Sequence, residues 1–376
     1  MRETNSTGAA WRSVVMRTRL RVVVATATVT VFLIAGHARG QGQAAAVTCS
    51  SGLVAAVADS VAEAFDKHQF VFIGSTHGGR KAHDFLLCLL SRPAFQSRVT
   101  DVLVEWANPV HQAQVDRYLL RLEPVPLDSL RRVWFDTDAP RLWARLPLIP
   151  EFYERVRSMN ARVDFARRIR VLGGCEPIDW SSVNAATDVA MYPFKNNWAA
   201  HVITEHFAPD PRRRLLVVYG DGHIHHSGGH MMAQLAVALD RARLFVLGTI
   251  ESSEPTDRDG VGRIGDATRP FYLSRGRLPS AGPYPRALFY ANDEPLADHV
   301  DAVAYLGPER DRDLSNQTAL TQEEEAEVRR RDAIKGDLQQ LMQLRFGNRD
   351  RWFRSHPNEL PRDPRRDSSR DAGKLR

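Results

Sequence analysis

The strongest constraint on the fold is a set of short, unbroken apolar runs at Phe70–Ile73, Val102–Val104 and Leu215–Tyr219. These runs do not alternate with polar residues, which is typical of strands that are buried on both faces. Stretches with helical spacing of apolar residues separate the runs, and strands that alternate with helices favour a parallel sheet. The sequence therefore predicts an α/β fold, a mainly parallel central sheet with helices on both faces and further helical elaborations. Other strands are expected at Ile169–Leu172, Leu244–Gly248, Ala287–Tyr290 and Ala302–Leu306.

Each of the three runs leads into residues that can do chemistry. The first and third end in the same pattern, Gly-x-x-His, with the histidines at His77 and His223, and the second is followed directly by Glu105. Because ligands of open parallel sheets bind at the carboxyl ends of the strands, we expect these three side chains to converge in one pocket. Two imidazoles and a carboxylate can act as general acids and bases or bind a divalent metal ion. The structural alternatives are turn histidines without chemistry and a glutamate in a salt bridge with an arginine.

Three more histidines, His225, His226 and His230, follow His223 closely. A His-x-His-His cluster resembles the zinc motif of metallo-β-lactamases, but Ser-Gly stands where that family has Asp-His. We therefore interpret the three as residues at the rim of the pocket. The sequence contains no phosphate-binding loop, nucleophile elbow or dinucleotide-binding fingerprint.

The net charge of +6 is concentrated at the two ends of the chain. Residues 1–38 carry +4 and residues 349–376 carry another +4, which leaves −2 for the remainder. A basic surface for nucleic acid is therefore not expected on the folded part.

The N-terminal segment has the pattern of a signal peptide. Arg17, Arg19 and Arg21 precede Val22–Gly36, a mostly apolar stretch of 15 residues. This length is short for a membrane span but typical of a signal-peptide core, and small residues allow cleavage after Ala38. We therefore predict an exported protein (periplasmic, cell-envelope or secreted) with no stable membrane span after cleavage. An uncleaved N-terminal membrane anchor is the alternative.

The cysteines do not define a disulfide framework. The chain has three, Cys49, Cys88 and Cys175, and an odd number leaves at least one unpaired. Cys88 lies in an apolar helical stretch and is interpreted as a core residue. A single disulfide is compatible with the sequence, but the sequence does not say which cysteines would form it.

The domain boundaries follow from changes in composition. We predict a signal peptide over 1–38, a single α/β domain over 50–346, and a disordered basic tail over 347–376, where Arg, Asp, Pro and Ser show no apolar periodicity. Ser252–Pro285 is rich in Gly, Pro and charge, which predicts a loop that could form a lid. Thr321–Glu324 has the capping-box pattern and predicts a helix that continues to about Phe346.

The paired Gly-x-x-His motifs, together with Glu105 at a strand tip, resemble the superfamily that includes erythromycin esterases, ChaN-like haem-binding proteins and the Tiki/TraB proteases. The resemblance extends from about Phe70 to Leu247. Within it, an uncharacterised bacterial branch often has Gly-Asp-Pro-Pro-Ile-Asp-Trp where this chain has Gly174–Trp180. Cys175 stands in place of the first Asp of that motif, unless Glu176 takes its part.

The resemblance implies an esterase- or Tiki-like pocket in which water hydrolyses an ester or amide of a small-molecule or peptide substrate. His77 would be the general base, Glu105 would orient His77 or hold a metal ion, and His223 would polarise the carbonyl or bind the same metal. The alternative that ChaN-like relatives imply is a non-enzymatic protein that binds haem or a divalent metal ion. A third alternative is an inactive scaffold with a relic pocket.

Three further residues are candidate substrate-binding residues. Arg80 lies three residues after His77 and could bind an anionic group, or it could simply point into solvent. Asn108 and Asp179 belong to the pieces of sequence that carry the resemblance.

Overall fold

The computed structural model describes residues 49, 51–75, 77–227, 229–250, 261–280, 294–308, 317–336, 352–353, 355, 360 and 363–365. The predicted signal peptide (1–38) and the predicted strand Ala287–Tyr290 lie outside these residues. Residues 44–376 group into one compact unit. Within the described part of the chain, no helix is both long enough and apolar enough to cross a membrane.

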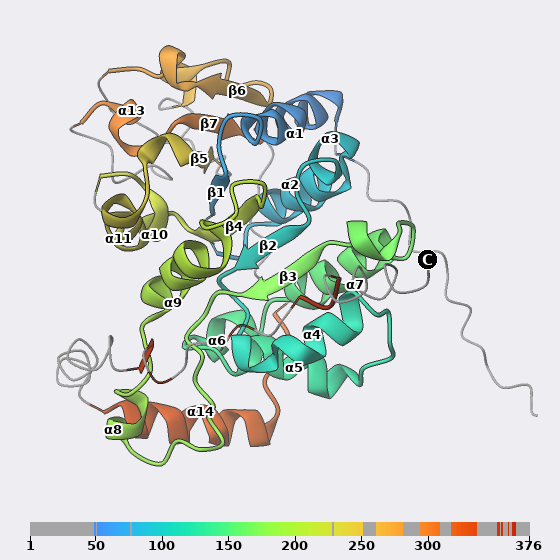
Figure 1. Ribbon diagram of the computed structural model, residues 1–376, viewed down its shortest axis with the longest axis vertical. Helices are drawn as coiled ribbons and strands as arrows, with labels where there is room; N and C mark the ends of the chain where they lie inside the picture. Colours follow the sequence, from blue (N-terminus) through green and yellow to red (C-terminus); the bar gives the residue numbers. More distant parts are fainter. Residues whose placement is uncertain are drawn as a thin grey trace, which may run out of the picture. The chain divides into compact units, whose positions relative to one another are not determined.

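A seven-stranded sheet forms the centre of the described structure (Figure 1). Its strands are β1 (Phe70–Ser75), β2 (Asp101–Val104), β3 (Arg170–Gly173), β4 (Leu215–Gly220), β5 (Leu244–Ile250), β6 (Phe271–Ser274) and β7 (Ala302–Tyr305). They lie in the order β3-β2-β4-β1-β5-β7-β6, and all neighbours are parallel except β6, which is antiparallel to β7. The prediction of a mainly parallel sheet is confirmed.

The central strand β1 shows why the apolar runs are unbroken. Val71 and Ile73 pack into the core on one face of the sheet, and Phe70 and Phe72 pack into the core on the other face. None of the four is more than 3% exposed. Burying a side chain of this size stabilises the fold by about 1.5–3 kcal/mol. A polar residue would therefore lower the stability on either face of the sheet.

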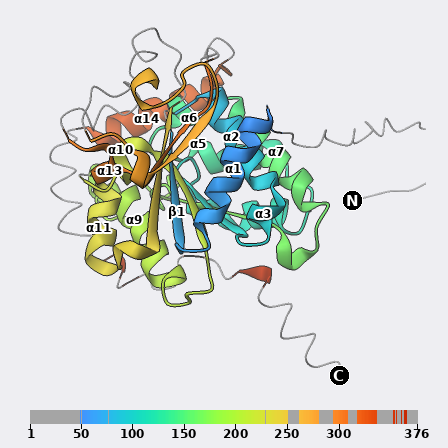
Figure 2. The ribbon, with the colours of Figure 1, turned by 90° about the horizontal axis from the view of Figure 1, so that it is seen from above.

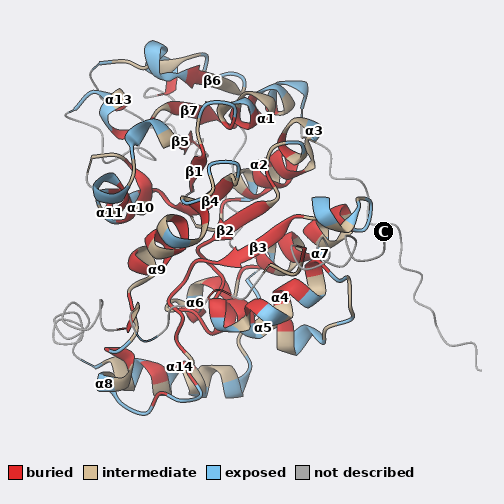
Figure 3. Cartoon of the chain, viewed as in Figure 1, coloured by how far each residue is buried: buried red, intermediate tan, exposed pale blue. Residues whose placement is uncertain are grey.

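Helices cover both faces of the sheet, as the sequence predicted (Figures 1 and 2). One face is covered by α1 (Gly52–Ala64), α2 (Arg80–Ser91), α3 (Pro93–Gln96), α4 (Gln112–Leu119), α5 (Leu127–Phe135), α6 (Pro140–Trp143) and α7 (Leu148–Asn160). The other face is covered by α9 (Lys195–His201), the π-helical segment η3 (Val202–Phe207), α10 (Asp221–Ile224), α11 (His230–Ala238) and α13 (Leu296–His299). Short connecting helices are η1 (Pro109–His111), η2 (Phe165–Arg167), α8 (Ala186–Val189), η4 (Arg241–Arg243) and η5 (Arg275–Arg277). Strands β2, β3 and β4 between these layers are buried along their length (Figure 3).

The chain changes faces between the neighbouring strands β1 and β4. After β1 it continues into α2 on the first face, whereas after β4 it continues into α10 and α11 on the second face. Connections that diverge in this way leave a crevice outside the carboxyl ends of the two strands, which is where open α/β sheets bind ligands. His77 and His223 follow β1 and β4 within three residues, so both lie at this crevice.

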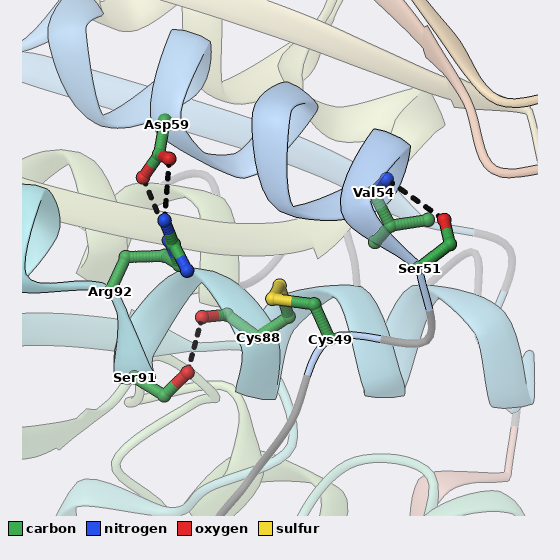
Figure 4. Close-up of a disulfide and its surroundings, with 7 residues drawn as sticks. All are labelled: Cys49, Ser51, Val54, Asp59, Cys88, Ser91 and Arg92. Carbon is green, nitrogen blue, oxygen red and sulfur yellow. Dashed lines mark hydrogen bonds and ion pairs between the residues drawn. A yellow bond between two sulfur atoms is a disulfide. The ribbon is translucent and has the colours of Figure 1, made fainter.

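A disulfide between Cys49 and Cys88 joins the chain ahead of α1 to helix α2 (Figure 4). The Oγ of Ser51 caps α1 by accepting a hydrogen bond from a backbone N–H of its first turn. Arg92, just after α2, donates to both carboxylate oxygens of Asp59 on α1, at 2.7 and 2.8 Å. The first two helices are therefore held together covalently as well as by packing, a pairing that the sequence had left open.

The predicted loop Ser252–Pro285 contains a strand in its described part, so that prediction is wrong for β6. Phe271 and Tyr272 are only partly buried, because β6 lies at the edge of the sheet and pairs with β7 alone. A four-residue edge strand needs no continuous apolar run, and its sequence therefore did not stand out from the surrounding loop. Residues 251–260 and 281–293 lie outside the described residues.

The predicted capping box is confirmed at the start of α14 (Gln322–Lys335). The Oγ1 of Thr321 accepts from the N–H of Glu324 at 3.1 Å, and the Glu324 carboxylate accepts from the N–H of Thr321 at 2.9 Å. Gly336 follows the helix with a φ of +49°, which is unfavourable for residues with a side chain. The predicted continuation to Phe346 falls on residues outside the description.

Two aromatic residues of the C-terminal tail, Trp352 and Phe353, lie against the domain in the part of the tail that the structure describes. Trp352 is 3% exposed, and its ring centroid lies 5.9 Å from that of Trp198 on α9. Phe353 stacks on His201 with 4.2 Å between centroids. Two adjacent aromatic side chains provide enough apolar surface to anchor a segment that is otherwise polar, and this local pair outweighs the lack of periodicity.

Candidate functional site

The structure brings His77, Glu105 and His223 together at the carboxyl ends of β1, β2 and β4, three neighbouring strands. The Nε2 of His77 lies 3.8 Å from Glu105 Oε2, and the Nε2 of His223 lies 3.6 Å from Glu105 Oε1. Glu105 is 1% exposed, whereas the side chains of His77 and His223 are 32% and 23% exposed. The predicted convergence is confirmed: a buried carboxylate lies between two imidazoles that solvent can reach.

The glycine of each Gly-x-x-His motif makes room for a side chain of the other motif. A Cβ on Gly220 would lie 2.6 Å from Cε1 of His77, and a Cβ on Gly74 would lie 1.7 Å from Oδ1 of Asp221. The backbone N–H of Gly220 also donates to Glu105 Oε2 at 2.7 Å. The two motifs therefore interlock at the crevice, which explains the repeated glycine without any appeal to unusual backbone angles.

Lys195 is the main residue of the site that the sequence did not indicate. It begins α9, and its Nζ lies 2.7 Å from Glu105 Oε1 and 3.3 Å from Asp138 Oδ2. Glu105 and Lys195 are 90 residues apart, and a lone lysine at a helix start has no local pattern that distinguishes it from a solvated one. The contact between the Lys195 ammonium group and the Glu105 carboxylate is therefore visible only in the folded structure.

The charges of the four groups follow from their surroundings. Burial lowers the pKa of both His77 and His223, although the Glu105 carboxylate opposes the shift. Burial would raise the pKa of Glu105, but the Lys195 ammonium and the two histidines outweigh it and lower the pKa. Burial opposes ionisation of Lys195 too, and the carboxylates of Asp138 and Glu105 nevertheless raise its pKa. At neutral pH the site thus holds two neutral imidazoles, a carboxylate and an ammonium group.

The contacts of Glu105 do not suit a divalent metal ion. Its Oε1 accepts from Lys195 and its Oε2 from the Gly220 N–H, so both oxygens already have donors. A metal ion bound to Glu105 would lie next to the like charge of Lys195. Among the described residues, the group whose ligand atoms come closest to a metal set is instead Asp138, Cys175 and Glu176.

In that second group, two carboxylates surround the thiol of Cys175. The Sγ of Cys175 lies 3.3 Å from Asp138 Oδ1 and 3.2 Å from Glu176 Oε2, and the thiol is the hydrogen-bond donor. Burial, reinforced by the two carboxylates, raises the pKa of Cys175. These surroundings favour the protonated thiol.

Haem does not fit the cavity beside His77. The cavity is lined by His77 and by apolar side chains that include Leu86, Trp106 and Trp143, and its volume is about 50 Å³. Sites for drug-sized ligands measure roughly 300–1,000 Å³, and a porphyrin is at least as large as such ligands. A small group fits this space, and a macrocycle does not.

The three predicted substrate-binding residues are not part of the cluster. Arg80 points to α7, where it pairs with Glu151 at 2.8 Å, and it also pairs with Asp84 on its own helix. Asn108 is 1% exposed, and its amide nitrogen donates to two backbone carbonyls, those of Asp136 and Ile178.

Asp179 accepts from the N–H and hydroxyl of Ser181 in a local turn. The side-chain contacts described for these three residues are thus ion pairs and loop-stabilising hydrogen bonds. None of these contacts joins Asn108 or Asp179 to His77, Glu105 or His223, and their part in substrate binding stays a prediction. For Arg80, the solvent-exposed alternative describes its position better.

The later histidines also differ from their predicted position at the rim. The side chain of His226 is 5% exposed and lies 2.7 Å from Asp301, and His225 packs against His299 with 5.7 Å between centroids. Both belong to the neighbourhood of α13 and β7, and neither is paired with Glu105. His230 begins α11 and is exposed.

Comparisons with known proteins leave the family open. No protein-family model matches the sequence, and no curated protein matches it. The solved structure of the type III effector HopBA1 aligns with 71% of this chain and 99% of its own, at 12% identity and a TM-score of 0.38. At this level the similarity carries no information on function.

Proposed function

We propose that this protein hydrolyses an ester or amide with water, using His77 as the general base. The observation that carries the proposal is the pairing of a neutral, solvent-accessible imidazole with a buried, ionised carboxylate. A neutral imidazole accepts a proton readily near pH 7, and a carboxylate beside it stabilises the imidazolium that forms. The resemblance of the strand-tip motifs to the erythromycin esterase, ChaN-like and Tiki/TraB superfamily supports the same reading.

In this mechanism His77 removes a proton from water as the water oxygen attacks the carbonyl carbon of the substrate. Glu105 orients His77 and offsets its new charge, and Lys195 keeps Glu105 ionised. His223 donates an N–H to the carbonyl oxygen, which becomes an oxyanion as the new C–O bond forms. The proton on His77 then passes to the leaving alcohol or amine as its bond to carbon breaks. Loss of a positioned base of this kind typically costs about 10²- to 10⁴-fold in rate.

The test uses His77→Ala and Glu105→Gln on a panel of ester and amide substrates. We expect each variant to lose at least about 10²-fold in kcat/KM while melting like the wild type. His68→Ala is the matched control, because His68 precedes the same strand β1 at its opposite end, where its Nδ1 contacts the carbonyl of Ala242. Equal activity of His77→Ala and His68→Ala would refute the assignment.

Chelation tests the metal-free form of the mechanism. Because Glu105 already forms an ion pair with Lys195, we expect prolonged treatment with EDTA to leave hydrolysis unchanged. Activity that is lost with EDTA and restored by zinc would contradict it.

We also propose that the protein works outside the cytoplasm. The Cys49–Cys88 disulfide supports this, because disulfides persist in oxidising compartments and are rare in the cytosol. A fusion of residues 1–50 to a reporter that is active only after export should give activity. A cytoplasmic reporter that retains its N-terminus would argue for the opposite.

A further inference from the structure

A serine, a histidine and a glutamate lie in contact outside the cluster of His77, Glu105 and His223. Ser227 belongs to the turn between α10 and α11, and Glu294 and His299 follow it by 67 and 72 residues. The Oγ of Ser227 lies 2.7 Å from Nδ1 of His299, and Nε2 of His299 lies 2.9 Å from Glu294 Oε2. A hydroxyl, an imidazole and a carboxylate in hydrogen-bond contact in this order are the arrangement that activates a serine as a nucleophile.

The contacts determine which nitrogen of the neutral His299 ring carries the proton. A carboxylate can only accept, so Nε2 donates to Glu294 and Nδ1 is left as an acceptor. The hydroxyl of Ser227 is closest to this acceptor, since its distances to Glu294 Oε2 and to Nε2 are longer, at 3.3 and 3.4 Å. Nδ1 of His299 is therefore in position to take the proton of the serine.

Backbone contacts hold the two segments of this cluster together. The N–H of His226, the residue before Ser227, donates to the carbonyl of His299 at 2.8 Å. The ring of His226 pairs with Asp301 at 2.7 Å, and Asp301 accepts from the N–H of Val246 on β5 at 2.9 Å. The approach of Ser227 to His299 is thus supported by the sheet, and a positioned pair of this kind needs little reorganisation before it reacts.

The cluster reaches the protein surface at Glu294. Its side chain is 59% exposed, whereas that of His299 is 2% exposed. Ser227 is only partly buried, and its Oγ lies within 3.3 Å of the exposed carboxylate. Three residues after Ser227 the chain enters α11, and the first N–H groups of a helix have no partner within it and favour negative charge. Donors for an oxyanion are therefore close along the chain.

We propose that Ser227, His299 and Glu294 form a second hydrolytic site, which acts on esters of carboxylic acids. Ser227 Oγ bonds to the carbonyl carbon as its proton passes to Nδ1 of His299. The bond from that carbon to the alcohol oxygen breaks, and the leaving oxygen takes the proton. Water then attacks the acyl-serine through His299, which takes a proton from the water and returns it to Ser227 as the acid leaves. Glu294 is a positioning residue that keeps the proton of His299 on Nε2.

The first test treats the full chain with a fluorophosphonate probe. In this reaction the serine oxygen bonds to phosphorus, the P–F bond breaks, fluoride leaves and the serine proton passes to the base. A hydroxyl that only completes the hydrogen bonds of His299 would have the same contacts but would not react. We expect peptide mass spectrometry to find the phosphonate on Ser227 of the native protein and not on Ser227 of heat-denatured protein. A native protein without label on Ser227 would overturn the proposal.

Variants then assign the reactivity to the cluster. His299→Gln removes the base and should slow labelling of Ser227 by about 10²- to 10⁴-fold. Glu294→Gln should slow it by about tenfold, the value of one hydrogen bond to a charged group, and Glu294→Asp should retain more of the rate because it keeps the carboxylate. Ser60→Ala is the matched control, since Ser60 is also partly buried but its Oγ donates to the backbone carbonyl of Ala56.

Melting temperatures show whether each variant is folded. Equal labelling rates in the wild type and in His299→Gln would overturn the proposal. His299 is buried, so if His299→Gln does not fold, the exposed position of Glu294 decides instead, and a wild-type rate in Glu294→Gln would overturn the proposal.

A last measurement separates this site from the site of His77. The mechanism at His77 forms no covalent intermediate, whereas the mechanism at Ser227 passes through an acyl-enzyme. His77→Ala that has been treated with 4-nitrophenyl acetate and quenched with acid should therefore carry an acetyl group on Ser227. The hydrolysis that remains in His77→Ala should fall further when Ser227→Ala is added. Remaining hydrolysis that Ser227→Ala does not change would overturn the second site and leave the proposed function untouched.

Discussion

Asp221, the second residue of the Gly220–His223 motif, gives a prediction that depends on a single buried proton. It is 6% exposed, it packs against Gly74 of the other motif, and its Oδ2 has no hydrogen-bond partner among the described residues. Burial raises its pKa to about 8. The folded protein therefore keeps this carboxyl protonated at pH 7, whereas the unfolded chain ionises it above about pH 4.

The sign and size of the effect follow from linkage. Between about pH 4 and pH 8 the folded state binds one more proton at Asp221 than the unfolded state, so stability falls as the pH rises. Each pH unit in this window costs about 1.4 kcal/mol, or about 2.7 kcal/mol from pH 5 to pH 7. Asp221→Asn removes the titrating group while keeping the shape of the side chain.

The assay is urea denaturation of wild type and Asp221→Asn at pH 5, 6 and 7, and again at pH 9 and 10. Subtracting one unfolding free energy from the other removes the contributions of other groups, such as the histidines. We expect the wild type to lose about 2.7 kcal/mol relative to the variant from pH 5 to pH 7. From pH 9 to pH 10 the difference should be flat, because Asp221 is then ionised in both states. A difference that does not change from pH 5 to pH 7 would show that Asp221 is ionised in the folded protein and would refute the reasoning.

Two further predictions concern the ends of the domain. Cys49 and Cys88 are 39 residues apart, so opening their disulfide should lower the unfolding free energy by about 4 kcal/mol, measured by urea denaturation with and without reductant; an unchanged midpoint would contradict this. Trp352→Ala should cost about 3–5 kcal/mol because the side chain is buried against Trp198. A melting temperature equal to that of the wild type would show instead that this contact adds nothing to stability.

The sequence sufficed for those parts of the site that lie on strands. An unbroken apolar run is a local pattern, and the residue that follows it is placed at the edge of a parallel sheet by topology alone. Glu105, His77 and His223 could therefore be predicted to meet without knowledge of the strand order. Lys195 could not, because its approach to Glu105 depends on the path of the 41 residues between β3 and β4.

The positions that the sequence describes least well have a common feature. Asn108 and Asp179 lie in loops near the carboxyl edge, and a polar side chain there can face either a ligand or the loop backbone. Both side chains form hydrogen bonds with backbone groups of the loops. The burial of Trp352 was not predicted for a related reason, because one buried residue creates no repeating apolar pattern in the sequence. Sequence patterns report repeated burial, and they do not report isolated contacts between distant segments.

The position of β4 has a consequence for how the molecule comes into being. The chain makes β1, β2 and β3 first, yet β4 lies between β1 and β2. A nascent chain that ends before Leu215 has His77 and Glu105 but lacks the strand that must fill the gap between them, and it exposes strand edges that can pair with other chains. β4 joins β1 to β2 and carries Gly220 and His223 with it. The strand that joins the two parts of the sheet is therefore also the strand that completes the site, and a chain that lacks β4 has no site with which to act.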